Sequence, residues 1–404
     1  MNVSRIDEMI MRLEGLDSLE RQDIEELQLK KLNALLMRFK ELPHTFYPDL
    51  PAHLESLSDL CKLPFTTDED LARNPGSFLT GSQSEIERVL SDATSGTTGS
   101  QKRVFYTAKD LENTVELFKA GLGELVFPGS RTMICMPFSG PNGLGDLIAK
   151  AIEDLGAVPL KVGSYVNYSE LACVLEREKP DTFVGFPTNL LSLLRACGKG
   201  SLRRALVSAD ACPGSVTGAS EDILGTALFP HYGSREMALG GAICCPAHEG
   251  MHLRENHCIA EIVGENGEVL PRGEYGELVI TTIGMQAMPL IRYRTGDRAV
   301  ILKDLCPCGS SVLRLGPDIS RLNEDKAALA DNEMYKFPSV IDCSYKLEEH
   351  VLSVDIIHKG PIDKTAVISS LSPIFPDCEI TLDLTCFSSA LYPLYKGKRI
   401  IMQE

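Results

Sequence analysis

The sequence predicts an α/β protein with a large N-terminal domain of mixed sheets and flanking helices, a β-rich subdomain, and a small α+β C-terminal lid domain. Three observations predict this fold. Between about residues 100 and 230, short apolar runs alternate with helical patterns. From residue 251 the pattern changes to strand, turn and strand. After "CPCGSS" a last stretch mixes strands with a helix, so we place the domains at 1–317 and 318–404.

The N-terminal residues have leucines and isoleucines at helical spacing, which predicts a helix from residue 4 to 41. Three prolines in "ELPHTFYPDLP" then end the helical pattern. The chain has 404 residues, which is too long for one ordinary hydrophobic core and indicates two or three domains.

The middle of the chain predicts a parallel sheet with crossover helices. Its expected strands are "TMICMPF", "AVPLKV", "DTFVGF" and "RALVSA", and helical patterns such as "GLGDLIAKAIEDLG" and "NLLSLLRAC" lie between them. The β-rich section begins with "HCIAEIVGENGEVLPRGEYGELVITTI", where Glu-Asn-Gly marks a turn. The C-terminal domain contains the strand "EEHVLSVDII" and the helix "KTAVISSLSPI".

The composition excludes several classes of protein. A net charge of −16 argues against nucleic acid as the main partner, because phosphate backbones require clustered Lys and Arg. No apolar run reaches the ~20 residues of a membrane span, and the amphipathic N-terminus differs from a signal peptide. Thirteen cysteines without an export signal predict a reducing cytoplasm, where thiols stay free or bind metal.

The segment "DATSGTTGSQKR", residues 92–103, has the composition of a phosphate-binding loop. Its small residues allow backbone N–H groups to approach phosphate oxygens closely, and Lys102 adds a positive charge. It lacks the Walker pattern, and a flexible turn is the alternative interpretation.

Two further segments carry polar groups suited to a nucleotide. In "HYGSREM", residues 231–237, Glu236 is a candidate Mg²⁺ ligand and Tyr232 could stack on a purine. In "RYRTGD", residues 292–297, Asp297 could accept hydrogen bonds from ribose hydroxyls. The alternatives are a solvated surface glutamate and a charged strand end.

Together and in this order, the three segments resemble the adenylate-forming superfamily of acyl-CoA synthetases, adenylation domains and luciferases. Within it they are similar to the phenylacetate-CoA ligase branch, which has "SSGTTGKP", then "YG-x-TE", then "GELVFTTLTKEAxPLIRYRTxD". This chain reads "GELVITTIGMQAMPLIRYRTGD" over residues 276–297. The resemblance covers about residues 60–325 and is weak in the C-terminal domain.

The resemblance implies a role for each matching residue. The phosphates of ATP would lie against Ser95, Gly96, Thr97, Thr98, Gly99 and Lys102. The adenosine would contact Ala209, Asp210, Tyr232, Gly233, Ser234 and Asp297, and Glu236 would hold Mg²⁺. Arg321 matches the arginine of the family's hinge, and Lys398 would reach the α-phosphate and the carboxylate as charge develops. A solvated charge in a basic tail is the alternative for Lys398.

Cysteines and histidines on both sides of the ribose-binding segment predict a structural zinc site. Cys306 and Cys308 form C-x-C, and thiolates with imidazole are typical zinc ligands. Branch members with "CPCG" also carry a Cys seven residues before a His, which implies Cys245 and His252 as the other ligands. Cys244 and His248 remain substitutes, and buried reduced thiols are the alternative interpretation.

The implied reaction has two steps. A small carboxylic acid, aryl acids included, attacks the α-phosphate of ATP–Mg²⁺ and gives an acyl-adenylate and pyrophosphate. After rotation of the small domain, a thiol, usually that of coenzyme A, takes the acyl group. The acyl pocket should involve Phe138, Asn142, Phe186 and Asn189. The resemblance allows a homodimer.

This sequence departs from the family pattern at four places. Arg235 replaces the threonine of "YG-x-TE" and adds a cation near the phosphates, which makes it a candidate catalytic residue. Gln101 replaces the proline of the phosphate loop, and "SRLNE" replaces the hinge "GRxDD". "DNEMYKFP", residues 331–338, replaces a glycine-rich loop beside the thiol tunnel. Transfer to a protein thiol or an amine, and a non-catalytic nucleotide-binding role, are therefore alternatives to coenzyme A ligation.

Overall fold

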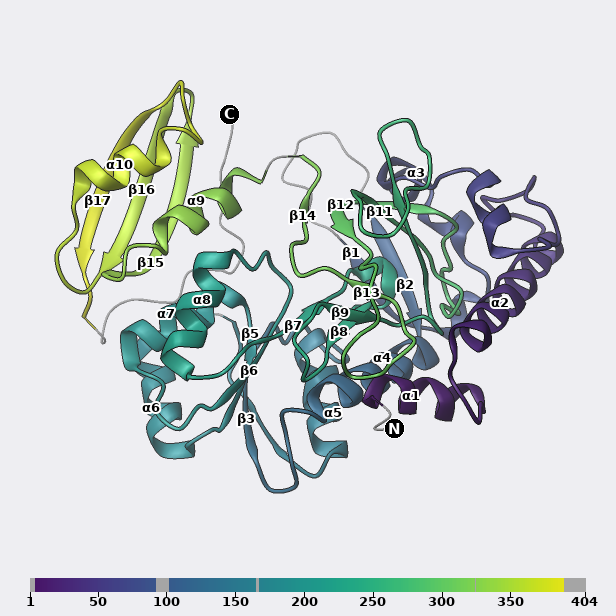
Figure 1. Cartoon of the computed structure of the whole chain (residues 1–404), viewed down its shortest axis with the longest axis horizontal. Helices are drawn as coiled ribbons and strands as arrows, with labels where there is room; N and C mark the ends of the chain where they lie inside the picture. The colour runs from purple at the N-terminus through teal and green to yellow at the C-terminus, as the bar shows by residue number, and fades with distance from the viewer. Residues whose placement is uncertain (1–3, 92–101, 165–166, 324, 389–404) are drawn as a thin grey trace. The chain divides into compact units, whose positions relative to one another are not determined.

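The computed structural model of the chain describes residues 4–91, 102–164, 167–323 and 325–388 (Figure 1). The chain folds into two compact units. Unit 1 contains Met1–Glu124 and His231–Asn323, and unit 2 contains Leu125–Pro230 and Glu324–Glu404. These units differ from the predicted division at 317/318, and the lid domain as a separately moving part stays a prediction.

Unit 1 begins with helices. They are α1 (Arg5–Glu14), α2 (Arg21–Glu41), α3 (Asp68–Arg73) and α4 (Ala108–Leu122), with the short 3₁₀ turns η1 (Leu57–Lys62), η2 (Pro75–Phe78), η3 (Gln83–Glu85) and η4 (Arg235–Met237). The prediction of one helix over 4–41 is wrong in the middle. Gly15 ends α1 in the left-handed region (φ +67°), and its N–H donates to the carbonyl of Met11. A capping box of Glu20 and Asp23 then starts α2.

The strands of unit 1 are antiparallel, as the β-rich pattern predicts. They form a hairpin of β1 (Ile86–Ser91) and β2 (Arg103–Thr107) and a sheet of β10 (Ile259–Val263), β11 (Tyr275–Thr281), β12 (Tyr293–Val300) and β14 (Ser320–Arg321). A third set contains β8 (Ala242–Cys244), β9 (Met251–Leu253), β13 (Arg314–Leu315) and the last residues of β7 (Phe229–Tyr232). Ile6, Ile10, Leu117 and Ile243 lie in one buried cluster and so pack α1 and α4 with β8.

Unit 2 contains the predicted parallel sheet. Its strands are β3 (Arg131–Cys135), β4 (Val158–Lys161), β5 (Thr182–Gly185), β6 (Arg204–Val207) and the first residues of β7, and neighbouring strands run parallel in the order β4-β3-β5-β6-β7. The crossover helices are α5 (Leu144–Asp154), α6 (Tyr168–Glu178), α7 (Pro187–Cys197) and α8 (Gly214–Leu224). The chain goes from β3 outward to the edge strand β4 and then back across the sheet to β5, β6 and β7. Right-handed crossovers therefore put α5 on one face and the other three helices on the opposite face (Figure 1). The expected strands and helices of this segment are confirmed.

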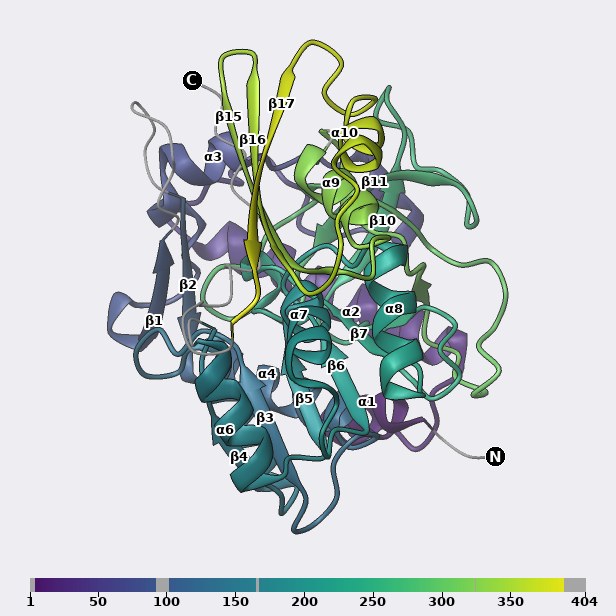
Figure 2. The same ribbon diagram turned by 90° about the vertical axis from the view of Figure 1, so that its left-hand side faces the viewer.

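The C-terminal part of unit 2 is the predicted small α+β fold. It consists of β15 (Val340–Glu348), β16 (Val351–His358), β17 (Glu379–Cys386), α9 (Lys326–Met334) and α10 (Lys364–Leu371). β15 and β16 are antiparallel, β16 and β17 are parallel, and both helices lie on one face of this sheet (Figure 2). None of the helices in the described ranges is long and apolar enough to cross a membrane.

Buried polar contacts join this C-terminal part to the crossover helices within unit 2. Arg195, in the last turn of α7, donates to the carbonyl oxygens of Tyr335 (2.8 Å), Phe337 (3.1 Å) and Val340 (2.6 Å). Tyr168 of α6 donates its hydroxyl to the carboxylate of Asp342, 2.9 Å away. One charged side chain therefore holds the segment that leads from α9 into β15.

We predict that Arg195→Met lowers the free energy of unfolding by about 2–4 kcal/mol, because carbonyl groups lose a charged donor. Urea unfolding measures this change. Arg177→Met on α6 is the matched control, since the Arg177 side chain is exposed and pairs with its chain neighbour Glu178, and it should change stability by less than about 0.5 kcal/mol. Equal effects of the two substitutions would contradict the anchoring role of Arg195.

We predict that the free energy of unfolding falls in acid because His231 in β7 is buried in its neutral form. Its ring packs 5.1 Å from that of Phe118, and burial lowers its pKa from 6.5 to about 4. The unfolded chain therefore binds this proton between pH 6.5 and 4 while the folded chain does not, so the stabilisation is lost as the pH falls through this window. This one group should cost about 2 kcal/mol between pH 7 and pH 5.

We expect His231→Phe to remove that part of the pH dependence, as measured by urea unfolding at pH 7 and pH 5. His53→Phe is the control, because the His53 side chain is 60% exposed. If the His231 variant loses as much stability as the wild type between the two pH values, another group is responsible.

Candidate functional site

Lys102 lies at the centre of a polar cluster in unit 1. It directly precedes β2, and its Nζ lies 2.7 Å from Oε1 of Glu236 and 2.9 Å from Oδ1 of Asp68. The hydroxyl of Tyr293 is 3.3 Å from the same Nζ and donates to Asp68. We call Lys102, Glu236, Asp68 and Tyr293 the Lys102 cluster; it joins residues from four distant segments.

The charges of the Lys102 cluster are strongly coupled. Burial by itself would lower the pKa of Lys102, but attraction to Glu236 and hydrogen bonds to Glu236 and Asp68 raise the pKa above its usual value. Burial and the two nearby carboxylates raise the pKa of Tyr293. At neutral pH the lysine is therefore positive and the tyrosine neutral, while the Glu236 side chain is only 5% exposed.

The backbone around Glu236 is tightly constrained. A side chain at Gly233 would meet the carbonyl oxygen of Leu239 at 2.6 Å, so this position requires glycine. Ala238 and Leu239 both have positive φ angles, +53° and +66°. The buried hydroxyl of Tyr106 in β2 donates to the carbonyl of Arg235 at 2.8 Å. These contacts hold η4 and therefore fix where Glu236 meets Lys102.

Tyr232 and Asp297 form the second polar contact of unit 1. The hydroxyl of Tyr232 donates to Oδ2 of Asp297 at 2.7 Å, and Nη1 of Arg321 lies 3.0 Å from Oδ1 of the same carboxylate. Asp297 and Arg321 are directly paired residues of β12 and β14. Burial and the neighbouring Asp297 raise the pKa of Tyr232, so the tyrosine remains a donor.

The same two segments build both contacts. Tyr232 and Glu236 both belong to "HYGSREM", and Tyr293 and Asp297 both belong to "RYRTGD". Because Tyr232 contacts Asp297, and Lys102 contacts both Glu236 and Tyr293, the two segments lie side by side in unit 1. Lys102 is the first described residue of "DATSGTTGSQKR", so these contacts bring the described parts of the three segments together.

The arginines of "RYRTGD" have structural partners. Arg292 is 2% exposed, bonds Glu261 at 2.9 Å and donates to the carbonyls of Cys61 and Leu63. Arg294 donates to Glu277 at 2.6 Å. Both cations hold the strand end that presents Asp297, and neither belongs to the Lys102 cluster.

Several predicted residues cannot be placed in this site. Ser95, Gly96, Thr97, Thr98, Gly99, Gln101 and Lys398 lie outside the described residues. Ala209 and Asp210 follow β6 in unit 2, where Ala209 has a φ of +67° and Asp210 accepts from the N–H of Ala211. The predicted acyl-pocket residues Phe186 and Asn189, at the start of α7, are buried in unit 2. The nucleotide roles of these residues remain predictions.

Two members of the Lys102 cluster carry no clear signal in the sequence. Asp68 begins α3 in "TTDED", a pattern that the helix cap of Thr67 and Asp70 already explains. Tyr293 lies inside "RYRTGD", where it has the appearance of an ordinary buried strand residue. Only the alternation of buried and exposed positions along that strand could have suggested that its hydroxyl faces Lys102.

The predicted metal ligands form one cluster in unit 1. The ligand atoms of Cys245, His252, Cys306 and Cys308 all lie within 4.8 Å of one another. The Sγ atoms of Cys245 and Cys306 are 3.6 Å apart, and Sγ of Cys308 is 3.5 Å from Nε2 of His252. A tetrahedral zinc ion requires about 3.8 Å between two sulfurs and about 3.6 Å between sulfur and nitrogen.

The donor set therefore fits a closed zinc site in type, number and spacing. The two residues left open as substitutes are not part of this cluster: Sγ of Cys244 lies 3.8 Å from Nδ1 of His248. Cys245 directly follows β8, His252 lies in β9, where it is paired with Arg314 of β13, and Cys306 and Cys308 lie between β12 and β13.

The chain has relatives of known activity. Residues 93–288 match the family model described as AMP-binding enzyme. The chain is 28% identical over 331 residues to the phenylacetate-coenzyme A ligase of Thermus thermophilus, covering 76% of this chain and 73% of that protein. It is 27% identical over 383 residues to the enzyme of the same name from Escherichia coli, covering 87% and 84%.

Solved structures support the fold independently. The 2-hydroxyisobutyryl-CoA ligase in its postadenylation state superimposes with a TM-score of 0.75 at 18% identity, covering 94% of this chain and 89% of that chain. The fold, the matched family model and the curated relatives agree with the resemblance seen in the sequence. Residues 93–288 therefore match the AMP-binding enzyme family, and the chain as a whole is similar to curated phenylacetate-CoA ligases.

Proposed function

We propose that this protein activates a small carboxylic acid with ATP to an acyl-adenylate and pyrophosphate, and then transfers the acyl group to coenzyme A with release of AMP. The observation that carries the proposal is a pair of contacts between distant segments: Lys102 lies against Glu236, and Tyr232 donates to Asp297. A purely structural core would not need an ammonium group and two carboxylates at the ends of these segments. The match to the AMP-binding family model and the named activity of the similar proteins support the same reaction.

The residues of unit 1 suit ATP in distinct ways. Lys102 supplies a permanent positive charge for phosphate oxygens, and the Asp297 carboxylate offers acceptors for ribose hydroxyls. Tyr232 is held by its bond to Asp297, which leaves its ring to pack on adenine as the resemblance implies. Lys398, outside the described residues, stays the predicted contact of the α-phosphate and the acid.

Mg²⁺ would be held by Glu236. A carboxylate is the ligand type that this ion prefers, and when bound with ATP the ion would neutralise phosphate charge. The Lys102 cluster contains two carboxylates and one ammonium group, so a triphosphate entering alone would meet a surplus of negative charge. This surplus supports a requirement for a divalent cation.

The acceptor in the second half-reaction has an alternative. Residues 331–338, which replace the family's glycine-rich loop, lie at the end of α9 and in the turn after it. Asp331 is 5% and Tyr335 1% exposed, and Tyr335 belongs to the core of unit 2. A protein thiol or an amine in place of coenzyme A is therefore the second candidate acceptor.

Acid-dependent exchange of pyrophosphate into ATP, measured over a panel of small aryl and aliphatic carboxylic acids, tests the first half-reaction. We expect exchange with at least one acid and formation of its coenzyme A thioester. Exchange without a thioester would favour the second acceptor class, and no exchange with any acid would favour a non-catalytic nucleotide-binding protein.

We predict that Glu236→Gln reduces the exchange rate by about 10²-fold or more, because it removes the proposed Mg²⁺ ligand and keeps the side-chain shape. Raising the Mg²⁺ concentration should recover part of the rate. Glu249→Gln is the matched control, since its side chain is 60% exposed and lies 3.8 Å from Arg314. An unchanged rate in the Glu236 variant would refute the metal role.

The four-ligand cluster is proposed to hold a structural zinc ion. Metal analysis of the purified protein should find one zinc per chain. Loss of a group that only hydrogen-bonds to a zinc ligand typically weakens zinc binding roughly 10–100-fold. Cys306→Ser removes a direct ligand, so it should weaken zinc binding by more than this and lower the midpoint of thermal unfolding. The exposed Cys61→Ser should retain zinc and stability. Wild-type protein without zinc, and unaffected by added zinc, would contradict the proposal.

The cellular location and the assembly state remain predictions. The cytoplasm is proposed because the chain has thirteen cysteines, three of which would bind the proposed zinc ion as thiolates. A homodimer is proposed only from the resemblance.

A further inference from the structure

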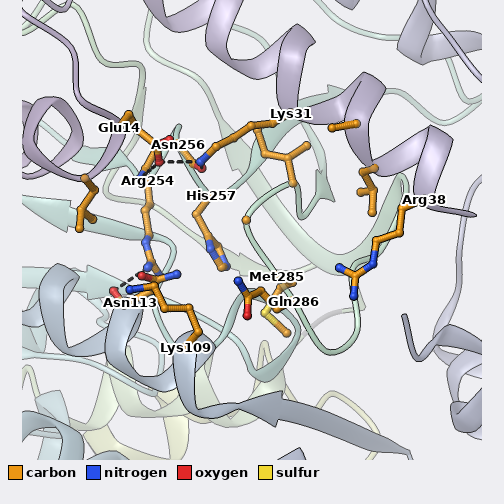
Figure 3. A pocket seen from close by; sticks show the side chains of 15 residues that line it. Glu14, Lys31, Arg38, Lys109, Asn113, Arg254, Asn256, His257, Met285 and Gln286 are labelled. Carbon is orange, nitrogen blue, oxygen red and sulfur yellow. Dashed lines mark hydrogen bonds and ion pairs between the residues drawn. The ribbon is translucent and has the colours of Figure 1, made fainter. Parts of the chain in front are cut away.

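A charged cavity lies in unit 1 among residues that have no role in the proposed reaction. Its volume is about 390 Å³, and α1, α2, α4 and the segments 254–257 and 283–286 enclose it (Figure 3). Four of its lining residues are cationic, namely Lys31, Arg38, Lys109 and Arg254. Among the residues that the structure describes, Glu14 is the one acidic residue that lines it. In a chain of net charge −16, this excess of positive charge needs an explanation.

Arg254 is the strongest sign of a missing anion. The residue is 1% exposed, and its Nη2 donates to the carbonyl of Asn113. Its Nε and Nη1 atoms have no hydrogen-bond partner among the described residues, and no carboxylate in those parts of the chain forms an ion pair with it. Burial lowers its pKa to about 10, so the group is still positive at neutral pH. A buried cation without an anion is costly, which suggests that a ligand supplies the charge.

The other polar groups of the cavity do not neutralise Arg254. Glu14 already has two partners, since its Oε1 lies 2.5 Å from Nζ of Lys31 and accepts a hydrogen bond from Nδ2 of Asn256 at 2.9 Å. His257 is 1% exposed, its Nε2 has no partner in the described parts of the chain, and burial holds its pKa well below the usual value, so the ring is neutral. Figure 3 shows the Glu14–Lys31 pair on one side of Arg254 and Asn113 with Lys109 on the other.

Two further carboxylates close enough to affect Arg254 already have other partners. Asp110 accepts from the N–H groups of Gln286 and Ala287 and caps α4, and Glu116 pairs with Lys119 and Arg12. Glu112, just outside the wall, pairs with Lys109 at 3.4 Å, so the four wall cations exceed Glu14 and Glu112 by about two positive charges.

We propose that this cavity binds a small organic phosphate, whose phosphate group lies against Arg254 and whose carbon part packs on the apolar side of the wall. A phosphate monoester carries up to two negative charges and accepts several charged hydrogen bonds, which matches the cationic wall better than a single carboxylate does. The volume exceeds that of inorganic phosphate alone, and the buried side chains of Leu35, Ile283 and Met285 line the cavity as well. The proposal is independent of acid activation, because none of these residues belongs to the Lys102 cluster.

Calorimetric titration of the full chain with phenyl phosphate, inorganic phosphate and benzoate tests the proposal. We expect phenyl phosphate to bind most tightly, because it fills both the charged and the apolar side. Absence of binding by either phosphate would overturn the proposal. Benzoate binding as tight as phenyl phosphate would also overturn it, since the ligand class would then be a carboxylate.

Variants assign the binding to the cavity. Arg254→Met should weaken phenyl phosphate binding at least tenfold and should fold, because it removes an unpaired buried charge and keeps a similar length. Lys109→Ala provides a second test at an exposed wall position that the fold does not need, with an expected loss of about threefold. Lys150→Ala, on an exposed face of α5, is the control without effect.

Lys102→Ala distinguishes this cavity from the proposed ATP-binding residues. Binding that survives in the Lys102 variant and is lost in the Arg254 variant supports the cavity. The reverse pattern would mean that phenyl phosphate occupies the ATP-binding residues, and the proposal would be wrong. Pyrophosphate exchange is measured separately, so failure of one proposal leaves the other open to its own test.

Discussion

The buried contact between Lys102 and Glu236 is the constraint on which the rest of unit 1 depends. It joins the residue before β2 to the turn after β7, and Asp68 adds the start of α3. Removing one partner of such a pair leaves an uncompensated buried charge, which typically costs about 3–5 kcal/mol. Gly233, the positive φ angles of Ala238 and Leu239, and the Tyr106 bond to Arg235 all serve to hold this turn in place. The chain therefore maintains a strained turn to present one carboxylate.

Most of the fold could be predicted from the sequence because its signals are local. Apolar runs of four or five residues, separated by helical patterns, identify the strands of the parallel sheet, and short-range turn residues identify the β10–β11 hairpin. The helix boundary at Gly15 escapes prediction because leucine spacing continues through it, while the left-handed conformation of one glycine ends α1. The spacing of apolar residues alone does not show where such a helix ends.

The site was only partly predictable for a different reason. A motif is a pattern within one segment, so Lys102, Glu236 and Asp297 could be found from it. Asp68 becomes important only through Lys102, which is far away in the chain. Arg254 in "HLRENH" has no motif, and its significance comes from the lack of a paired carboxylate among the described residues. Conversely, Arg292 and Arg294 lie in a conspicuous motif and have structural partners. Arg254 differs from Arg292 and Arg294 in lacking an acidic partner among the described residues, and only the three-dimensional structure shows this difference.

Charge balance also gives a physical meaning to the unusual Arg235. The Lys102 cluster has one positive and two negative charges, and tyrosine hydroxyls add none at neutral pH. Arg235 precedes Glu236 in the same turn, and we propose that its positive charge reduces the net negative charge of the cluster without cancelling it. The family's threonine would leave a larger surplus of negative charge, which only the metal ion could offset. A chain with arginine here should therefore depend less steeply on Mg²⁺ for binding the phosphates of ATP, while Glu236 still provides the oxygen ligand.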